Sequence, residues 1–416
     1  MLSADLQALL GIGVFIALAL PFSDDYRRIR WRRVGMAVVL QFAVCAALLR
    51  IPVIIRGLAV LNGGVAALGD ATREGTAFVF GYVGGGPAPF VVSDPTHSFV
   101  LGFQSLTLIM VISALSAVLW QWRLLPLLIG AIAGFFRRFL GTGGPAGFAV
   151  SANVFLGQVE APLVVRPYLS SMSRYELLLL MTAGMSMIAG SVMVLYALIL
   201  ADQFPNVAAH LLTKSLISIP AAILFAHLMV PEAADDRPLP SPQPYAGTID
   251  ALTRGTADGL MIWLNVLAML LVLVALVALA NRGLSSLPLW AGQPLSLERI
   301  AGWAFTPLAW LMGIDWAQAG VTGHFLGIKT VLNEFIAYLR LAAAPPDALD
   351  GHARLITIYA LCGFANFASM GIQVTGIAAM APERRADLIE LAPRALWAAT
   401  LASLMTGSVV GIVGAP

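Results

Sequence analysis

Charged side chains are scarce in this sequence. Lys, Arg, Asp and Glu make up 11% of the 416 residues, whereas they make up about 25% of a typical soluble protein. Apolar residues account for 59% of the chain, and the mean hydropathy is +0.87. This composition excludes an ordinary soluble domain and indicates an integral membrane protein. The net charge of +2 gives no sign of nucleic-acid binding.

Cysteine and histidine are also rare. Cys45 and Cys362 each lie inside an apolar segment, so no disulfide framework is indicated. The five histidines are scattered, and the sequence lacks the HExxH and GxSxG motifs of hydrolases. We therefore expect neither an enzyme nor a bound cofactor. A basic region before the first apolar run is missing too, so residues 6–22 are interpreted as a retained span rather than a signal peptide.

Long apolar runs predict the membrane topology, because a spanning helix needs about 20 mostly apolar residues. Eight runs meet this requirement: 5–22, 35–55, 98–121, 176–201, 207–230, 258–281, 353–380 and 390–413. Arginines crowd the loop at 27–33, which the positive-inside rule assigns to the cytoplasm. Both termini then face the outer, periplasmic side of a bacterial inner membrane.

Two further stretches, near 125–168 and 297–340, are too interrupted by Gly, Pro and charged residues to be simple spans. They fit hairpins that enter the membrane and turn back, shielded by protein. Each hairpin is followed by a long span with a weak middle and then by an uninterrupted span. This repeated order, with a Phe-Leu-Gly tripeptide and a glutamate in each hairpin, predicts an inverted repeat.

The expected fold is all-α, with two inverted repeats and separate scaffold and transport parts. Each repeat would contain a re-entrant hairpin, a discontinuous helix and a continuous helix. The predicted parts are N-terminal scaffold spans at 1–121, a first repeat with an interfacial helix at 122–230, a cytoplasmic loop at 231–256, a central scaffold span at 257–281, and a second repeat with an external interfacial segment at 282–416.

The first hairpin carries polar residues that lipid could not satisfy. Its tract NVFLGQVEAPLVVR occupies residues 153–166. The glycine permits a tight turn and the proline can begin a helix, which places Gln158 and Glu160 near a helix N-terminus. Gln158 could bind the edge of a heterocyclic base, and Glu160 could accept hydrogen bonds or hold a proton. The alternative is a structural ion pair of Glu160 with Arg166 or Lys329.

The second hairpin contains the tract FLGIKTVLNEFIAY at 325–338. A carboxylate accepts two hydrogen bonds from a vicinal diol, so Glu334 suits a ribose. The alternative is an ion pair between Lys329 and Glu334. Because these residues are five positions apart, they are poorly placed for an i,i+4 bond, which favours substrate contact.

The span at 353–380 is interrupted by CGFANFAS. Asn366 and Ser369 stand three residues apart, on one face of a helix. Phe364 could stack on a planar ring, or could simply pack against lipid or core. In the matching span at 176–201, Ser186 lies in a similar break, where either a ligand contact or tight helix packing would explain it.

At these residues the sequence resembles the concentrative nucleoside transporters. The matching tracts are Asn153–Pro167, Gly327–Tyr338, Cys362–Ser369 and the APxRR loop at Ala381–Arg385. The resemblance implies a homotrimer whose subunits each have eight spans and two re-entrant hairpins. It implies import of nucleosides of the uridine, cytidine and adenosine class by an ion gradient. The transport part would move like an elevator against the scaffold, and membrane lipids would be the other partners.

The resemblance also implies which residues contact the substrate. Gln158 and Glu160 fall at positions that bind the base, and Val192 and Phe364 at positions that pack against it. The positions that contact the ribose are Glu334, Asn366 and Ser369. Val159 departs from the pattern, because the family often has Thr or Ser there, with a hydroxyl toward the base.

The coupling ion is left open between proton and sodium. Sodium-coupled members bind the ion with an Asn side chain, a Ser side chain and backbone carbonyls. The matching positions here are Asn153, Leu156, Met187 and Ile188. Met187 occupies the serine position, and a hard cation prefers oxygen ligands. The residues therefore favour a proton carried by Glu160 or Glu334, whereas the family background favours sodium.

Two other classes of membrane transport protein fit the sequence less well. A channel would need a continuous polar lining or a repeated carbonyl filter, and the sequence shows neither pattern. The alternative is a secondary carrier with paired hairpins for another small polar or anionic metabolite. The two conspicuous glutamates, Glu160 and Glu334, disfavour a carboxylate substrate, because an anion site would be expected to present a cation.

Overall fold

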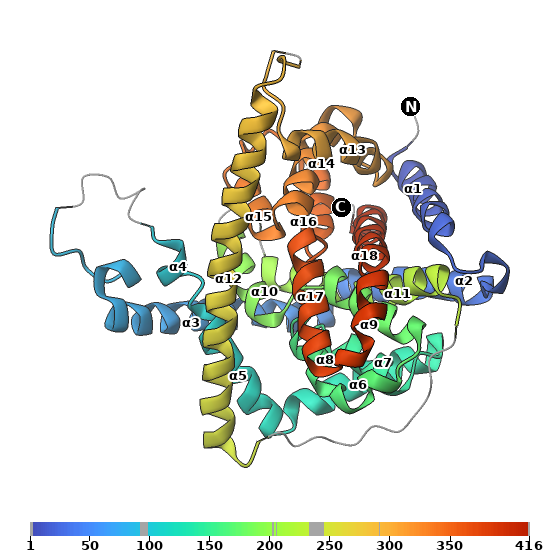
Figure 1. Ribbon diagram of the computed structural model, residues 1–416. Helices are drawn as coiled ribbons and strands as arrows, with labels where there is room; N and C mark the ends of the chain where they lie inside the picture. The colour runs from blue at the N-terminus through green and yellow to red at the C-terminus, as the bar shows by residue number, and fades with distance from the viewer. Residues whose placement is uncertain are drawn as a thin grey trace.

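The computed structural model describes residues 3–91, 99–201, 204, 206–232, 245–290 and 292–414, and it is all-α (Figure 1). The N-terminal half contains α1 (Ala4–Ala19), α2 (Trp31–Arg50), α3 (Pro52–Phe80), α4 (Leu101–Gln104), α5 (Leu108–Gln121), α6 (Leu124–Leu140), α7 (Gly144–Ala152), α8 (Glu160–Val164), α9 (Arg174–Ser186), α10 (Gly190–Leu200) and α11 (Val207–Met229). The C-terminal half contains α12 (Thr248–Ser285), α13 (Leu297–Leu311), α14 (Trp316–Val331), α15 (Glu334–Ala342), α16 (Gly351–Leu361), α17 (Phe367–Met380) and α18 (Arg385–Gly414).

The helices agree with most of the predicted spans. Among the described residues, six helical stretches are long and apolar enough to cross a membrane: Ala4–Phe22, Trp31–Arg50, Leu101–Gln121, Val207–Met229, Thr248–Ser285 and Pro382–Gly414. The other two predicted spans are each split, one between α9 and α10 and the other between α16 and α17. The weak middles seen in the sequence are therefore breaks in the helices, at residues 187–189 and 362–366.

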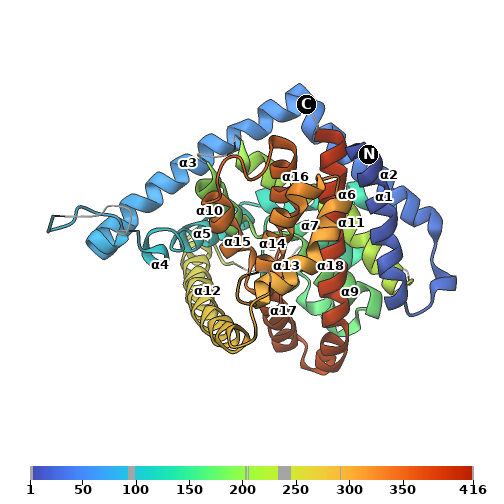
Figure 2. The same cartoon turned by 90° about the horizontal axis from the view of Figure 1, so that it is seen from above.

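The predicted span at 35–55 is wrong at its end. The second helix ends at Arg50, and Pro52 begins the separate 29-residue α3. Proline is well suited to this first position, because it has no amide hydrogen to leave unpaired. Figures 1 and 2 show α3 and α4 extending away from the rest of the molecule. The sequence prediction had assigned no helix to residues 56–80.

The core is centred on α11 and α18. Within the most apolar window of each helix, 89% of the residues of α11 and 83% of those of α18 are buried, whereas only 11% are buried in α12. Figure 2 shows α18 surrounded by α1, α9 and α11, while α12 stands at the periphery. An apolar helix so exposed requires lipid or another subunit around it.

Several loops that were predicted to be cytoplasmic share one end of the molecule. The amide of Asp24 donates to the carbonyl of Met229 at 2.8 Å, and the carboxylate of Asp24 pairs with Arg394. Arg174 pairs with Glu390 at 2.8 Å. The loop after α1, the start of α9, the end of α11 and the start of α18 therefore meet at one end of the molecule, and which side of the membrane this end faces stays a prediction.

Candidate functional site

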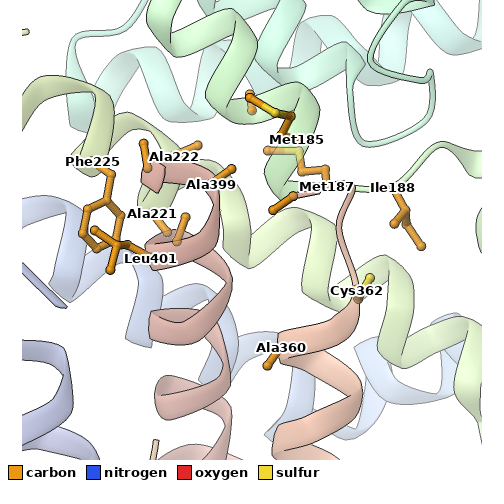
Figure 3. Packing of buried hydrophobic residues seen from close by; sticks show 14 of the residues in the cluster. Met185, Met187, Ile188, Ala221, Ala222, Phe225, Ala360, Cys362, Ala399 and Leu401 are labelled. Carbon is orange, nitrogen blue, oxygen red and sulfur yellow. The ribbon is translucent and has the colours of Figure 1, made fainter. Parts of the chain in front are cut away.

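The site lies where the two broken spans meet the tip of the first hairpin. The amide of Phe364, in the second break, donates to the carbonyl of Met187, in the first break, at 3.3 Å. The amide of Gly190, at the start of α10, donates to the carbonyl of Phe155 in the hairpin at 3.0 Å. In Figure 3, Met187 from one break and Cys362 from the other belong to the same apolar cluster. The fold thus brings both halves of the chain to one place.

Glu334 is the centre of a buried hydrogen-bond cluster. It is 5% exposed and is the first residue of α15. Its Oε1 accepts a hydrogen bond from the hydroxyl of Tyr196 at 2.7 Å. Its Oε2 accepts one from Nδ2 of Asn366 at 2.8 Å. Tyr196 lies on α10 and Asn366 in the second break, so one carboxylate joins the two halves of the chain.

Asn366 is held in place by its second role as a helix cap. Its Oδ1 accepts a hydrogen bond from the amide of Ser369 at 2.8 Å, which caps α17. Because the oxygen is engaged in this way, the Nδ2 group is the end directed at Glu334. Ser369 is itself buried. The structure therefore links the three predicted ribose contacts in a chain: Glu334 binds Asn366, and Asn366 binds the amide of Ser369.

The tip of the first hairpin packs the Glu160 side chain against its own backbone. A Cβ atom at Gly157 would lie 2.1 Å from Oε2 of Glu160, so a side chain there would require the Glu160 carboxylate to move. The amides of residues 157, 159 and 160 are in hydrogen-bonding positions to this carboxylate. A helix starts here as predicted, but α8 begins at Glu160, two residues before the proline that was expected to begin it. Val159 lies against α17, because a Cβ at Gly376 would be 3.2 Å from its Cγ1.

Gln158 lies beside a glutamine that sequence reasoning missed. The Oε1 atom of Gln158 is buried without a hydrogen-bond partner among the described residues, as are Oε1 and Nε2 of Gln373. Both side chains contact Gly184 of α9, where a Cβ would lie 2.3 Å from Nε2 of Gln373 and 3.1 Å from Cβ of Gln158. Gln373 follows Ser369 by four residues on α17, so the two share a helix face. That spacing could have identified it from the sequence.

Tyr196 and two lysines complete the surroundings. Lys329 donates to the carbonyl of Ala360 at 2.9 Å. It does not form the ion pair with Glu334 that the sequence had left as an alternative. Tyr196 and Lys214 were not predicted, because each is a single polar residue inside an apolar span. Val192 and Phe364, the two predicted packing residues for the base, are partly buried against the main core.

The positions that match the family's sodium ligands are one oxygen short. Met187 is buried and presents a thioether where the family has a hydroxyl. The hydroxyl of the neighbouring Ser186 donates to the carbonyl of Ala183 at 3.3 Å, and the carbonyl of Ser186 accepts from Lys214. Asn153 turns its Nδ2 to Ala149 at 3.2 Å and leaves its oxygen available. This donor set does not fit a full sodium cage.

Protein-family models match three segments of the chain. The model for the "Na+ dependent nucleoside transporter C-terminus" matches residues 210–411, and that for the "Na+ dependent nucleoside transporter N-terminus" matches residues 10–83. Residues 103–203 match a model described as "Nucleoside recognition".

Similar proteins match over nearly the whole chain. The nucleoside permease NupC of Helicobacter pylori is 33% identical over 99% of this chain and 98% of its own length. The sodium/nucleoside cotransporter 1 of Mus musculus is 32% identical over 98% of this chain and 63% of its own length. A solved structure of CNTnw in an inward-facing substrate-bound state is 34% identical, covers 99% of this chain and 98% of its own, and has a TM-score of 0.88.

Proposed function

This chain belongs to the concentrative nucleoside transporter family, and we propose that it imports nucleosides by cation symport. It is a multi-pass membrane protein whose relatives are named as transporters and permeases rather than enzymes. The observation that carries the proposal is the Glu334 carboxylate, which both repeats hold in place through Tyr196 and Asn366. Its remaining lone pairs can accept the two hydroxyls of a ribose.

Gln158 and Gln373 support recognition of a base at the other end of the site. A side-chain amide presents a donor and an acceptor side by side, which matches the edge of a nucleobase. Because three of their four amide atoms are buried without a partner among the described residues, a substrate that satisfied them would be favoured over one that did not. The partly buried Val192 and Phe364 would pack against the ring.

The coupling ion that fits these residues better is the proton. The missing oxygen at Met187 argues against a full sodium cage, whereas a proton needs only a carboxylate. Glu160 and Glu334 are the two carboxylates at the site, and either could be protonated during the cycle. The family is described as Na+ dependent, so the proposal sets this chain apart from its sodium-coupled relatives.

The transport cycle is proposed to be an elevator motion in a homotrimer. The scaffold would comprise 1–121 and 257–281, and the moving parts would be the repeats at 122–230 and 282–416. Of the loop at 231–256, residues 233–244 lie outside the described residues. The exposed apolar surface of α12 supports a role against lipid or neighbouring subunits. We place the protein in a bacterial inner membrane, with both termini on the periplasmic side.

Uptake by purified protein in proteoliposomes tests the function. Labelled uridine should be taken up above the level of empty vesicles, and unlabelled uridine, cytidine or adenosine should compete. Dicarboxylates should not compete, because the site presents two glutamates. Competition by a dicarboxylate but not by nucleosides would refute the proposal and favour a carrier for anionic metabolites.

A further inference from the structure

Lysine has an unusual distribution in this chain. Of the 24 basic residues counted as Lys or Arg, only two are lysines, Lys214 and Lys329. Both are buried, at 0% and 3% exposure, whereas the cations in the surface ion pairs of the described residues are all arginines. A buried ammonium is costly unless its surroundings compensate it, so each lysine requires an explanation.

Each lysine binds a backbone carbonyl at the C-terminal end of a helix that stops at one of the two breaks. The ammonium of Lys214, from α11, donates to the carbonyl of Ser186, the last residue of α9. The ammonium of Lys329, from α14, donates to the carbonyl of Ala360, one residue before the end of α16. The last carbonyls of a helix lack amide partners and carry partial negative charge. An ammonium placed there compensates that charge and is compensated by it.

Lys214 also touches the second break. A Cβ atom at Gly363 would lie 3.0 Å from Nζ of Lys214 and 2.8 Å from the carbonyl oxygen of Ser186. Gly363 has φ +150°, so a side chain there would be both strained and in contact with the ammonium. The Lys214 ammonium therefore sits at the point where the two breaks approach each other. None of the ion pairs formed by the described residues involves it.

The Lys214 ammonium lies next to Met187, the position at which an oxygen ligand for sodium is missing. Ser186, which holds the ammonium, directly precedes Met187, which replaces the hydroxyl ligand. The chain thus lacks an oxygen that a free cation would need and carries a covalently attached cation that binds the preceding residue. An attached cation is always present and has no translational entropy to lose, so its binding does not depend on external sodium.

We propose that the Lys214 ammonium is a tethered cation that takes over sodium's task of joining the two breaks, so that the nucleoside site forms without sodium. Lys214 is a positioning residue: it does not contact the substrate, and it shapes the nucleoside site by holding the backbone at Ser186 and Gly363 in place. The proposal rests on nucleoside transport as the function. It adds that binding at this site is indifferent to sodium, whichever ion drives accumulation.

The test is uridine counterflow in proteoliposomes, which requires a formed site but no ion gradient. Wild-type exchange should be the same in sodium and in choline buffer. Lys214→Met keeps the length of the side chain and removes the charge. It should lower exchange in choline by at least about tenfold, the ratio for losing one charge-assisted hydrogen bond. Ser215→Ala is the matched control, because this neighbouring hydroxyl is buried on α11 without a partner among the described residues.

A double variant tests whether a sodium ion can replace the Lys214 ammonium. Lys214→Ala combined with Met187→Ser removes the tethered cation and restores the hydroxyl ligand. Its exchange should depend on sodium, and sodium should raise its thermal unfolding temperature while leaving that of the wild type unchanged. The unfolding temperature is measured on purified protein, so the wild-type result stands even if a variant folds poorly.

The outcomes separate this inference from the function on which it rests. Wild-type vesicles that exchange no uridine in either buffer would refute nucleoside transport itself. Wild-type exchange that requires sodium, sodium-dependent thermal stabilisation of the wild type, or unaltered exchange by a folded Lys214→Met protein in choline would overturn the role of Lys214 and leave the transport function intact.

Discussion

Replacing Glu334 by glutamine is the sharpest test of the substrate site. The introduced amide keeps the size of the side chain but offers one acceptor oxygen instead of two. Asn366 can only donate to it, because the Oδ1 of Asn366 is engaged in capping α17. The amide oxygen must therefore face Asn366, and its NH₂ group must face Tyr196, whose hydroxyl can rotate to accept. We expect the variant to fold, because the internal cluster can be satisfied again.

The substitution should mainly weaken the hydrogen bonds between residue 334 and the ribose. A hydrogen bond to a charged group contributes about 1.5–3 kcal/mol and a neutral one about 0.5–1.5 kcal/mol. Making two diol bonds neutral therefore costs about 2–3 kcal/mol, which corresponds to a roughly 30- to 160-fold lower kcat/KM. Initial rates of uridine uptake in proteoliposomes measure this, with Glu74→Gln, on the exposed face of α3, as the control. Near-normal uptake by a folded Glu334→Gln protein would show that Glu334 does not bind the ribose.

Three further substitutions test other parts of the site. Val159→Thr restores a hydroxyl and should change the order of preference among nucleosides by about 1 kcal/mol; identical competition profiles would mean that residue 159 does not face the base. Gly184→Ala places a methyl group against Gln373 and should weaken uridine binding by about 1–3 kcal/mol through overpacking, which tryptophan-fluorescence titration with uridine can measure. Arg384 donates to the carbonyls of residues 169, 170 and 172 and pairs with Asp387 at 2.8 Å. Lysine lacks the branched guanidinium and cannot make all of these hydrogen bonds at once. Arg384→Lys should therefore lower the unfolding temperature while leaving uridine affinity unchanged.

The sequence predicted the parts of the fold that composition controls. Apolar runs of spanning length identified the helices, and small or polar residues inside two of them identified the breaks. It missed α3 because that segment contains Arg56, Asp70, Arg73 and Glu74 together with several glycines, so it shows no continuous apolar run. A hydropathy argument therefore has no signal to detect this helix.

Within the site, the sequence predicted residues that belong to motifs and missed those that act alone. Glu334 and Asn366 stand in recognisable tracts, and the structure joins them at 2.8 Å. Lys214 and Tyr196 are isolated polar residues in apolar helices. Their roles depend on which break or hairpin their helix packs against, and such non-local pairing is not encoded by any spacing within one helix.

The coupling ion gives the most direct test of the account. Accumulation of labelled uridine in proteoliposomes would be measured under two conditions. The first is an inward sodium gradient at equal pH with a protonophore present, and the second is an inward proton gradient without sodium. The residues at Met187 and Lys214 lead us to expect accumulation above equilibrium with the proton gradient alone. Robust accumulation driven by the sodium gradient with the protonophore present would contradict proton-coupled nucleoside import by this chain.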